Sequence, residues 1–119
     1  MEAARVETVA LFDISRLKSI FGDDQVDLGP LILMFVESLK EERDRVRSLE
    51  LELDLAKLRL YSHSIKGAPA NYGADRLEKI SRRVEQACIK DDRESSTALL
   101  PEFFAMIDLT IDAARRALS

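Results

Sequence analysis

Apolar residues recur every three or four positions along the last part of the chain. The set consists of Leu100, Phe104, Ile107, Ile111, Ala114 and Leu118. Because an α-helix has 3.6 residues per turn, this spacing places the whole set on one face of a helix. An apolar face of that length has to be covered by other apolar surfaces. The pattern therefore predicts a long helix that packs within a bundle.

Two helices are expected in the first half of the chain. A short one begins at Asp13, whose side chain is a favoured N-cap, and is closed by Gly22. A longer one begins between Asp24 and Asp27 and carries Pro30 near its first turn, where a missing N–H is tolerated. The inward residues are expected to be Ile14, Leu17 and Ile20 in the short helix, and Leu31, Phe35, Leu39, Val46 and Leu49 in the longer one.

Two further helices fill the middle of the chain. Residues 49–53 alternate Leu and Glu, but so short and isolated a segment is interpreted as a turn rather than a strand. Asp54 is the expected N-cap of the next helix, and the helix after that runs from about Ala74 to Lys90. Their inward residues are expected to be Leu55, Leu58, Ile65 and Ala68, then Leu77, Ile80, Val84 and Cys88. The pattern predicts an all-α fold, an antiparallel four-helix bundle with a short additional N-terminal helix.

Length and composition fit a single domain. The chain has 119 residues with four glycines and three prolines, and helix-forming residues dominate. We expect residues 1–8 to be a flexible lead and residues 9–119 to form the bundle. The net charge of −4 argues against nucleic acid or an anionic membrane as a partner, because both select clustered Lys and Arg. A cytoplasmic monomer is expected, since the sequence has no signal-peptide core and every apolar stripe can be used internally.

His63 is the only histidine of the chain and lies in the middle of a predicted helix. Residues in a helix are about 100° apart around the axis, so His63 is expected to point away from Leu58 and Ile65 and out of the core. Near neutral pH, an unprotonated imidazole is an uncharged nucleophile. Lys66, one turn on, can offset the charge of a phosphoryl group, and Gly67 leaves room for a partner to approach. His63 is therefore a candidate phosphoryl carrier.

The same residues also permit simpler interpretations. On spacing alone, a lone exposed histidine is more often an ordinary surface residue. A metal site is not expected, because there is no second histidine and Cys88 lies on another helix in a buried-type position. The four glycines are scattered and form no phosphate-binding loop, so neither an ATP site nor another cofactor is expected in the chain.

The segment from His63 to Ala74, with the sequence HSIKGAPANYGA, resembles the histidine-containing phosphotransfer (HPt) domain family. In that family the active histidine is followed by an apolar residue, then Lys-Gly, small residues and a Gly-Ala pair that opens the next helix. The similarity continues at Leu77, Ser81, Val84 and Glu85. The resemblance implies that His63 accepts a phosphoryl group and passes it on, typically through Nε2.

The resemblance also implies a set of partners. His63 would exchange phosphate with an aspartate of a response-regulator receiver domain, in a multistep two-component relay that includes a hybrid sensor histidine kinase. The receiver domain would supply an acidic pocket and Mg²⁺. The chain itself would be a covalent carrier without its own ATP site, rather than an enzyme. The predicted docking residues for these partners are Arg59, Leu60, Ser64 and Ala70.

The segment departs from the family pattern at two positions. Pro69 lacks the N–H that would bond to the carbonyl of Ile65, so we expect a kink or an early end to regular hydrogen bonding there. Ser62 stands where alanine is common, which is a mild change.

Glu85 matches a family position, but we assign it no chemical role and interpret it as a surface or helix-pair contact. A neutral imidazole can serve as the nucleophile without a nearby base.

Two alternatives stay open. The run HSIKG at residues 63–67 also resembles the phosphotransfer module of a chemotaxis-type kinase, whose phosphoryl donor is ATP bound to another domain. The chain could instead be a non-catalytic bundle that binds a receiver domain without phosphate. The second alternative leaves both His63 and Lys66 without a purpose, because docking alone needs neither group.

Overall fold

The computed structural model describes residues 11–21, 27–67 and 69–118, which are mostly helical. The elements are α2 (Ile14–Phe21), α3 (Gly29–Arg47), α4 (Leu55–Gly67), the short 3-10 helix η1 (Pro69–Tyr72), α5 (Asp75–Ile89) and α6 (Arg93–Leu118). The lead predicted at residues 1–8 and the helix end predicted at Gly22 lie outside the described residues. Among the helices described, none is both long enough and apolar enough to cross a membrane.

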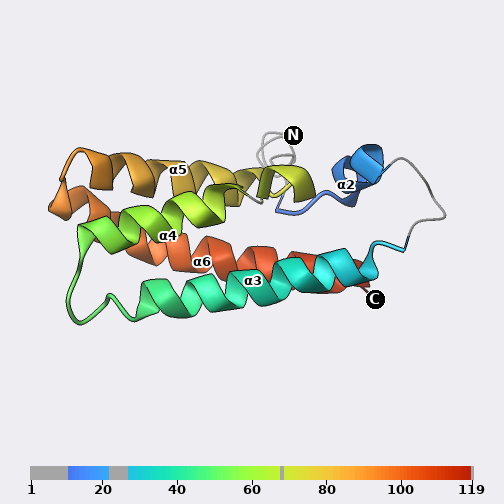
Figure 1. Ribbon diagram of the computed structural model, residues 1–119, viewed down its shortest axis with the longest axis horizontal. Helices are drawn as coiled ribbons and strands as arrows, with labels where there is room; N and C mark the ends of the chain where they lie inside the picture. The colour runs from blue at the N-terminus through green and yellow to red at the C-terminus, as the bar shows by residue number, and fades with distance from the viewer. Residues whose placement is uncertain (1–10, 22–26, 68, 119) are drawn as a thin grey trace, which may run out of the picture.

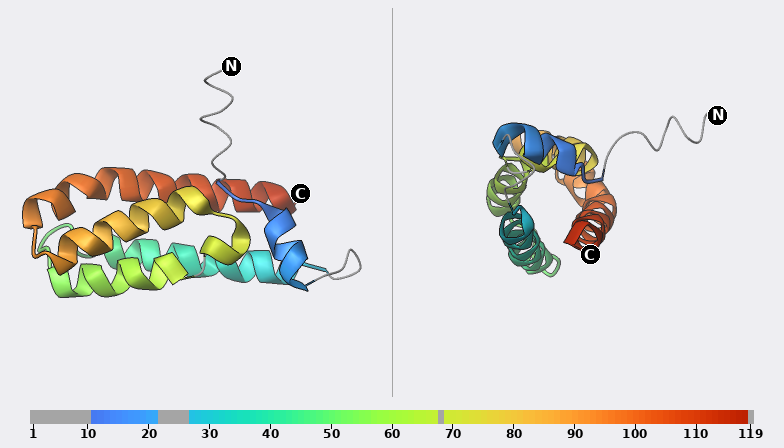
Figure 2. Two further views of the ribbon diagram at one scale, coloured as in Figure 1. Left: turned by 90° about the horizontal axis from the view of Figure 1, so that it is seen from above. Right: turned by 90° about the vertical axis from the view of Figure 1, so that its right-hand side faces the viewer.

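The four long helices alternate in direction and form a bundle (Figure 1). α4 packs against α3 and α5, and α6 packs against α5 and α3, so each long helix has two neighbours. A view along the bundle shows the four helices around a common axis, with α2 lying across one end (Figure 2). The predicted fold, an antiparallel four-helix bundle with a short additional N-terminal helix, is confirmed.

An apolar core fills the centre of the bundle. Each long helix contributes residues that are almost fully buried, as the spacing of apolar residues in the sequence requires. These are Ile32, Phe35, Val36, Leu39 and Val46 from α3, Leu58 and Ile65 from α4, Leu77, Ile80, Val84 and Cys88 from α5, and Phe103, Ile107, Ile111 and Ala114 from α6. Burial raises the pKa of the Cys88 thiol, so this residue is a packed side chain rather than a reactive nucleophile.

Some residues expected to face the core do not. Ile20 is 52% exposed, because α2 crosses the end of the bundle and only the Leu17 side of this short helix is covered. In α6 the fully buried aromatic residue is Phe103, and Phe104 is only partly buried. Phe103 lies about 40° from Ile107 around the helix axis and Phe104 about 60°, so Phe103 is nearer the centre of the apolar stripe. Four more expected core residues, Ile14, Leu31, Leu55 and Leu100, are partly buried, and Leu118 is exposed. The expected inward position of Ala68 lies outside the described residues.

α3 begins later than predicted, at Gly29 instead of between Asp24 and Asp27. The N–H of Gly29 donates a hydrogen bond to Oδ1 of Asp27 at 2.9 Å. Short polar side chains compete with the helix by bonding to nearby backbone in this way, so Asp27 stays outside the helix. Pro30 lies in the first turn of α3, as predicted.

The two predicted N-cap aspartates are confirmed. Oδ1 of Asp13 accepts a hydrogen bond from the N–H of Ser15 at 3.0 Å, just before α2. Oδ1 of Asp54 accepts one from the N–H of Lys57 at 3.1 Å, just before α4. Each bond satisfies an N–H that has no partner within its own helix. The start of α4, and with it the register of His63, is thereby set by Asp54.

The chain after α4 is tied to α3. α4 ends at Gly67, and η1 begins at Pro69, so the early end of the helix expected from the proline is confirmed. The ring of Tyr72 in η1 stacks on Phe35 of α3, with 4.1 Å between the ring centroids. The Tyr72 hydroxyl also donates a hydrogen bond to the carbonyl of Leu31 at 3.2 Å. These two contacts of Tyr72 hold the segment between α4 and α5 against α3.

Gly73 joins η1 to α5 in a conformation that suits glycine. Its φ is +65°, and an added Cβ would lie 2.5 Å from Cβ of Asp13 and 2.8 Å from the Asp13 carbonyl oxygen. We predict that Gly73→Ala lowers the free energy of unfolding by about 1–3 kcal/mol, measured by urea denaturation. Gly29→Ala is the control, because Gly29 lies in a helix, and it should change stability by less than about 1 kcal/mol. Equal effects of the two substitutions would contradict the role given to the positive φ.

Candidate functional site

His63 stands on the surface of α4, with 64% of its side chain exposed. Leu58 and Ile65, on the other side of the helix, are buried in the core. The outward orientation predicted from helical spacing is confirmed. The preceding residue, Ser62, is fully buried, and its hydroxyl donates a hydrogen bond to the carbonyl of Arg59 at 3.1 Å. The turn that carries the imidazole is thus packed against the bundle on its inner side.

A carboxylate from the neighbouring helix contacts the imidazole. Oε2 of Glu85, on α5, lies 2.6 Å from Nδ1 of His63, which is a hydrogen-bond distance. Only 8% of the Glu85 side chain is exposed, so the carboxylate is held in the interface between α4 and α5. A buried carboxylate is costly unless it is hydrogen-bonded, and the imidazole N–H supplies such a bond. The contact therefore fixes both side chains.

This contact decides which ring nitrogen is available. An ionised carboxylate only accepts hydrogen bonds, so the hydrogen between the two groups belongs to Nδ1 of His63. The tautomer follows from the hydrogen-bond geometry rather than from an observed hydrogen. In the neutral ring Nε2 then carries the lone pair, and it lies on the side of the ring away from Glu85. The site presents an oriented nucleophile on an exposed helix face.

An open hollow of about 420 Å³ adjoins the imidazole. Its lining is Ala56, Arg59, Leu60, His63 and Glu85. The four α4 residues among these lie within about 100° of one another around the helix axis, so they share one face of the helix. Ser64 is exposed next to His63 but does not line the hollow. The structure thus brings a cation, an exposed leucine and the imidazole together on one surface.

Three of the predicted site residues are described by their backbone alone. Lys66 and Gly67 are the last two residues of α4, and Ala70 lies in η1. The side chains of Lys66 and Ala70 are outside the described part of the structure. The charge stabilisation by Lys66, the steric access at Gly67 and the docking role of Ala70 stay predictions.

Glu85 and Ala56 are site residues that the sequence analysis missed. Glu85 lies four residues after Ser81 and three before Cys88, and both of these neighbours are buried. A carboxylate on such an inward stripe needs a partner, and this was the signal that could have identified it. The helix-pair contact assigned to Glu85 is correct, but its partner is the imidazole. The imidazole thus has a carboxylate beside it, although a neutral imidazole can act as a nucleophile without a base.

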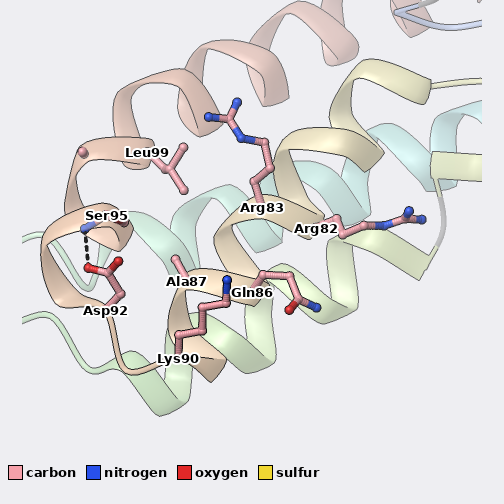
Figure 3. A pocket seen from close by; sticks show the side chains of 9 residues that line it. Arg82, Arg83, Gln86, Ala87, Lys90, Asp92, Ser95 and Leu99 are labelled. Atoms are coloured by element: carbon pink, nitrogen blue, oxygen red, sulfur yellow. Dashed lines mark hydrogen bonds between the residues drawn. The ribbon is translucent and has the colours of Figure 1, made fainter.

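A larger hollow, of about 580 Å³, lies between α5 and α6 (Figure 3). Its lining includes three cations, Arg82, Arg83 and Lys90, around the smaller side chain of Ala87. Arg83 and Ala87 are each two residues from Glu85, about 200° around the axis, and so lie on the other side of α5 from the imidazole. Within the described residues, no group of three or more His, Cys, Asp or Glu side chains could hold a metal ion.

A helical bundle with an exposed imidazole, oriented by a buried carboxylate, presents the kind of nucleophile that a phosphotransfer module needs. Comparison with protein-family models gives the same class, because the model of the Hpt domain matches residues 30–117, well over half of the chain. The chain belongs to the Hpt domain family, as the resemblance predicted. Hpt domains act in histidine phosphotransfer with receiver domains and histidine kinases. Comparisons with curated proteins and with solved structures give no match.

Proposed function

We propose that this Hpt domain relays a phosphoryl group between aspartates of receiver domains in a multistep two-component phosphorelay, with His63 as the phosphoacceptor. The observation that carries the proposal is the exposed imidazole whose Nδ1 lies 2.6 Å from Glu85, which leaves Nε2 free to attack. The partners are response-regulator receiver domains and a hybrid sensor kinase. The protein acts as a monomer in the cytoplasm, where it alternates between these partners.

The transfer step follows from the orientation of the ring. The Nε2 lone pair attacks the phosphorus of an aspartyl phosphate, the P–O bond breaks, and the aspartate leaves as a carboxylate with the electron pair. The ring, which still holds its Nδ1 hydrogen, becomes positively charged. The Glu85 carboxylate, 2.6 Å from Nδ1, stabilises that charge. In the return step a receiver aspartate attacks phosphorus, the P–N bond breaks, and the neutral imidazole is restored.

Other residues of α4 assist this step in the proposal. Lys66 offsets the negative charge on the phosphoryl oxygens, one turn after His63. Gly67 has no side chain, so the active site of the receiver approaches the imidazole closely. The receiver domain supplies Mg²⁺, and the chain itself is a carrier that uses no cofactor and no ATP site.

The receiver docks, in this proposal, on the face of α4 around the imidazole. Leu60 is 63% exposed and gives an apolar contact beside the hollow. Arg59 and Ser64 give polar contacts on the same exposed part of the helix. Ala70, beyond the end of α4, completes the surface. Covering Leu60 removes apolar area from water, which favours binding.

Labelling experiments separate the proposed relay from its rivals. The chain is incubated with receiver domains that carry a labelled aspartyl phosphate, and the label on the chain is tested for stability to acid and alkali. The relay predicts an acid-labile, alkali-stable label that passes on to a second, unlabelled receiver. If the chain acquires label only when a kinase domain and labelled ATP are added, the chemotaxis-type module would be favoured. Receivers that bind the chain but never transfer label would overturn the relay and favour the docking bundle.

A further inference from the structure

We infer that Arg59 is a phosphoryl-binding residue, whose guanidinium pairs with the oxygens of a phosphoryl group on Nε2 of His63. The inference deepens the proposed function and rests on it. Arg59 and His63 line the same hollow, together with Glu85. They are four residues apart on α4, which places them about 40° apart around the helix axis, one turn from each other.

The i, i+4 spacing of the two side chains allows this pairing. Side chains on an α-helix lean toward its N-terminus, so a residue covers the surface over the turn that precedes it. The imidazole of His63 therefore leans toward the turn of α4 that carries Arg59. Nδ1 is held by Glu85 on the α5 side, so a group on Nε2 extends over the open surface of α4. A long arginine side chain one turn away can reach the oxygens of that group.

Arg59 is available for such a contact. Within the described residues it makes no ion pair, whereas Arg43 is paired with Asp108 at 2.9 Å and Arg83 with Glu102 at 3.3 Å. The carbonyl of Arg59 accepts the hydrogen bond from the buried Ser62, so the backbone below the arginine is fixed. The phosphorylated imidazole gains about two negative charges, and an exposed cation beside it that has no ion pair can stabilise them.

The guanidinium group suits the phosphoryl oxygens better than a simple positive charge. Its planar fork donates two parallel N–H bonds to a pair of oxygens, and it stays protonated at every pH of interest. A cation at this position favours the dianionic form of the phosphoryl group over the monoanion. Removing the cation should therefore raise the pH at which the second phosphoryl proton is lost.

The test loads the imidazole without any partner protein. Phosphoramidate phosphorylates the wild-type chain: Nε2 attacks phosphorus, the P–N bond of the reagent breaks, and the leaving nitrogen takes up a proton and departs as ammonia. The phosphoryl group is then titrated by ³¹P NMR in wild type, Arg59→Ala, Arg59→Lys and Arg83→Ala. Arg83 is the matched control, because it is also exposed but faces the hollow between α5 and α6 (Figure 3).

We expect Arg59→Ala to raise the midpoint of the ³¹P titration by about 0.3 pH units. This is the effect expected from losing an exposed charge pair one turn apart on a helix. Arg59→Lys should restore most of the difference, Arg83→Ala should leave the midpoint unchanged, and 1 M salt should remove the effect. Equal midpoints in wild type and Arg59→Ala would overturn the role of Arg59 and leave the relay standing. A clear Arg59 effect together with receivers that never exchange phosphate would instead overturn the relay, and a wild-type His63 that phosphoramidate leaves unmodified would overturn both.

Discussion

His63→Gln is expected to abolish the transfer of phosphate from a labelled receiver domain, down to the background of the assay. His63 is the only imidazole of the chain, and the amide of glutamine is not a nucleophile that can form the P–N bond. The substitution should leave the fold intact, because 64% of the His63 side chain is exposed and an amide N–H can still donate to Glu85. The measurement is label on the chain after incubation with the receiver, alongside the thermal unfolding midpoint.

Lys57→Ala is the control for this substitution. Lys57 is exposed on the same helix, about 120° from His63 around the axis, and does not line the hollow, so its loss should leave transfer nearly unchanged. Both variants should unfold at nearly the wild-type temperature. Acid-labile label on folded His63→Gln at the wild-type level would show that another residue carries the phosphoryl group.

Glu85→Ala is expected to slow transfer about 100-fold, and Glu85→Gln about 10-fold. A hydrogen bond to a charged group contributes about 1.5–3 kcal/mol, and the alanine variant loses all of it. The glutamine carbonyl can still accept the Nδ1 hydrogen, so the tautomer is retained, but the charge that stabilises the phosphorylated ring is gone. The measurement is the single-turnover rate of label transfer at saturating receiver, which excludes effects on docking.

Glu102→Gln provides the matched control for the glutamate series. Glu102 is an exposed carboxylate on α6, paired with Arg83, and it has no contact with the imidazole. Its substitution should leave the transfer rate within about twofold of wild type, as expected for an exposed ion pair. If Glu85→Gln and Glu102→Gln transferred at the same rate, the carboxylate beside His63 would have no role in the reaction.

Helix positions and the face of His63 were predictable because they depend on local pattern. The spacing of Leu58 and Ile65 fixes the inner face of α4, and the outward direction of His63 follows from it. The caps at Asp13 and Asp54 also depend only on the residues beside them. For any single helix, the sequence is enough to predict which side chains face the core.

The rest of the site depends on how two helices are aligned. Whether Glu85 meets His63 is decided by the register of α5 against α4, and the periodicity of one helix says nothing about its neighbour. Phe103 and Phe104 both lie near the apolar stripe of α6, and Phe103 is buried because it is nearer the centre of the face that packs against the bundle. Local competition explains the late start of α3, where Asp27 bonds to Gly29 instead of entering the helix.

In the proposed relay, Glu85 holds His63 so that Nε2 receives the phosphoryl group. The decisive measurement is ¹⁵N and ³¹P NMR of the chain with labelled imidazole nitrogens, after phosphorylation by a receiver domain. We expect phosphorus coupling at Nε2 of His63, with the hydrogen retained on Nδ1. Phosphorus coupled to Nδ1, or phosphate carried on any other residue, would contradict this proposal.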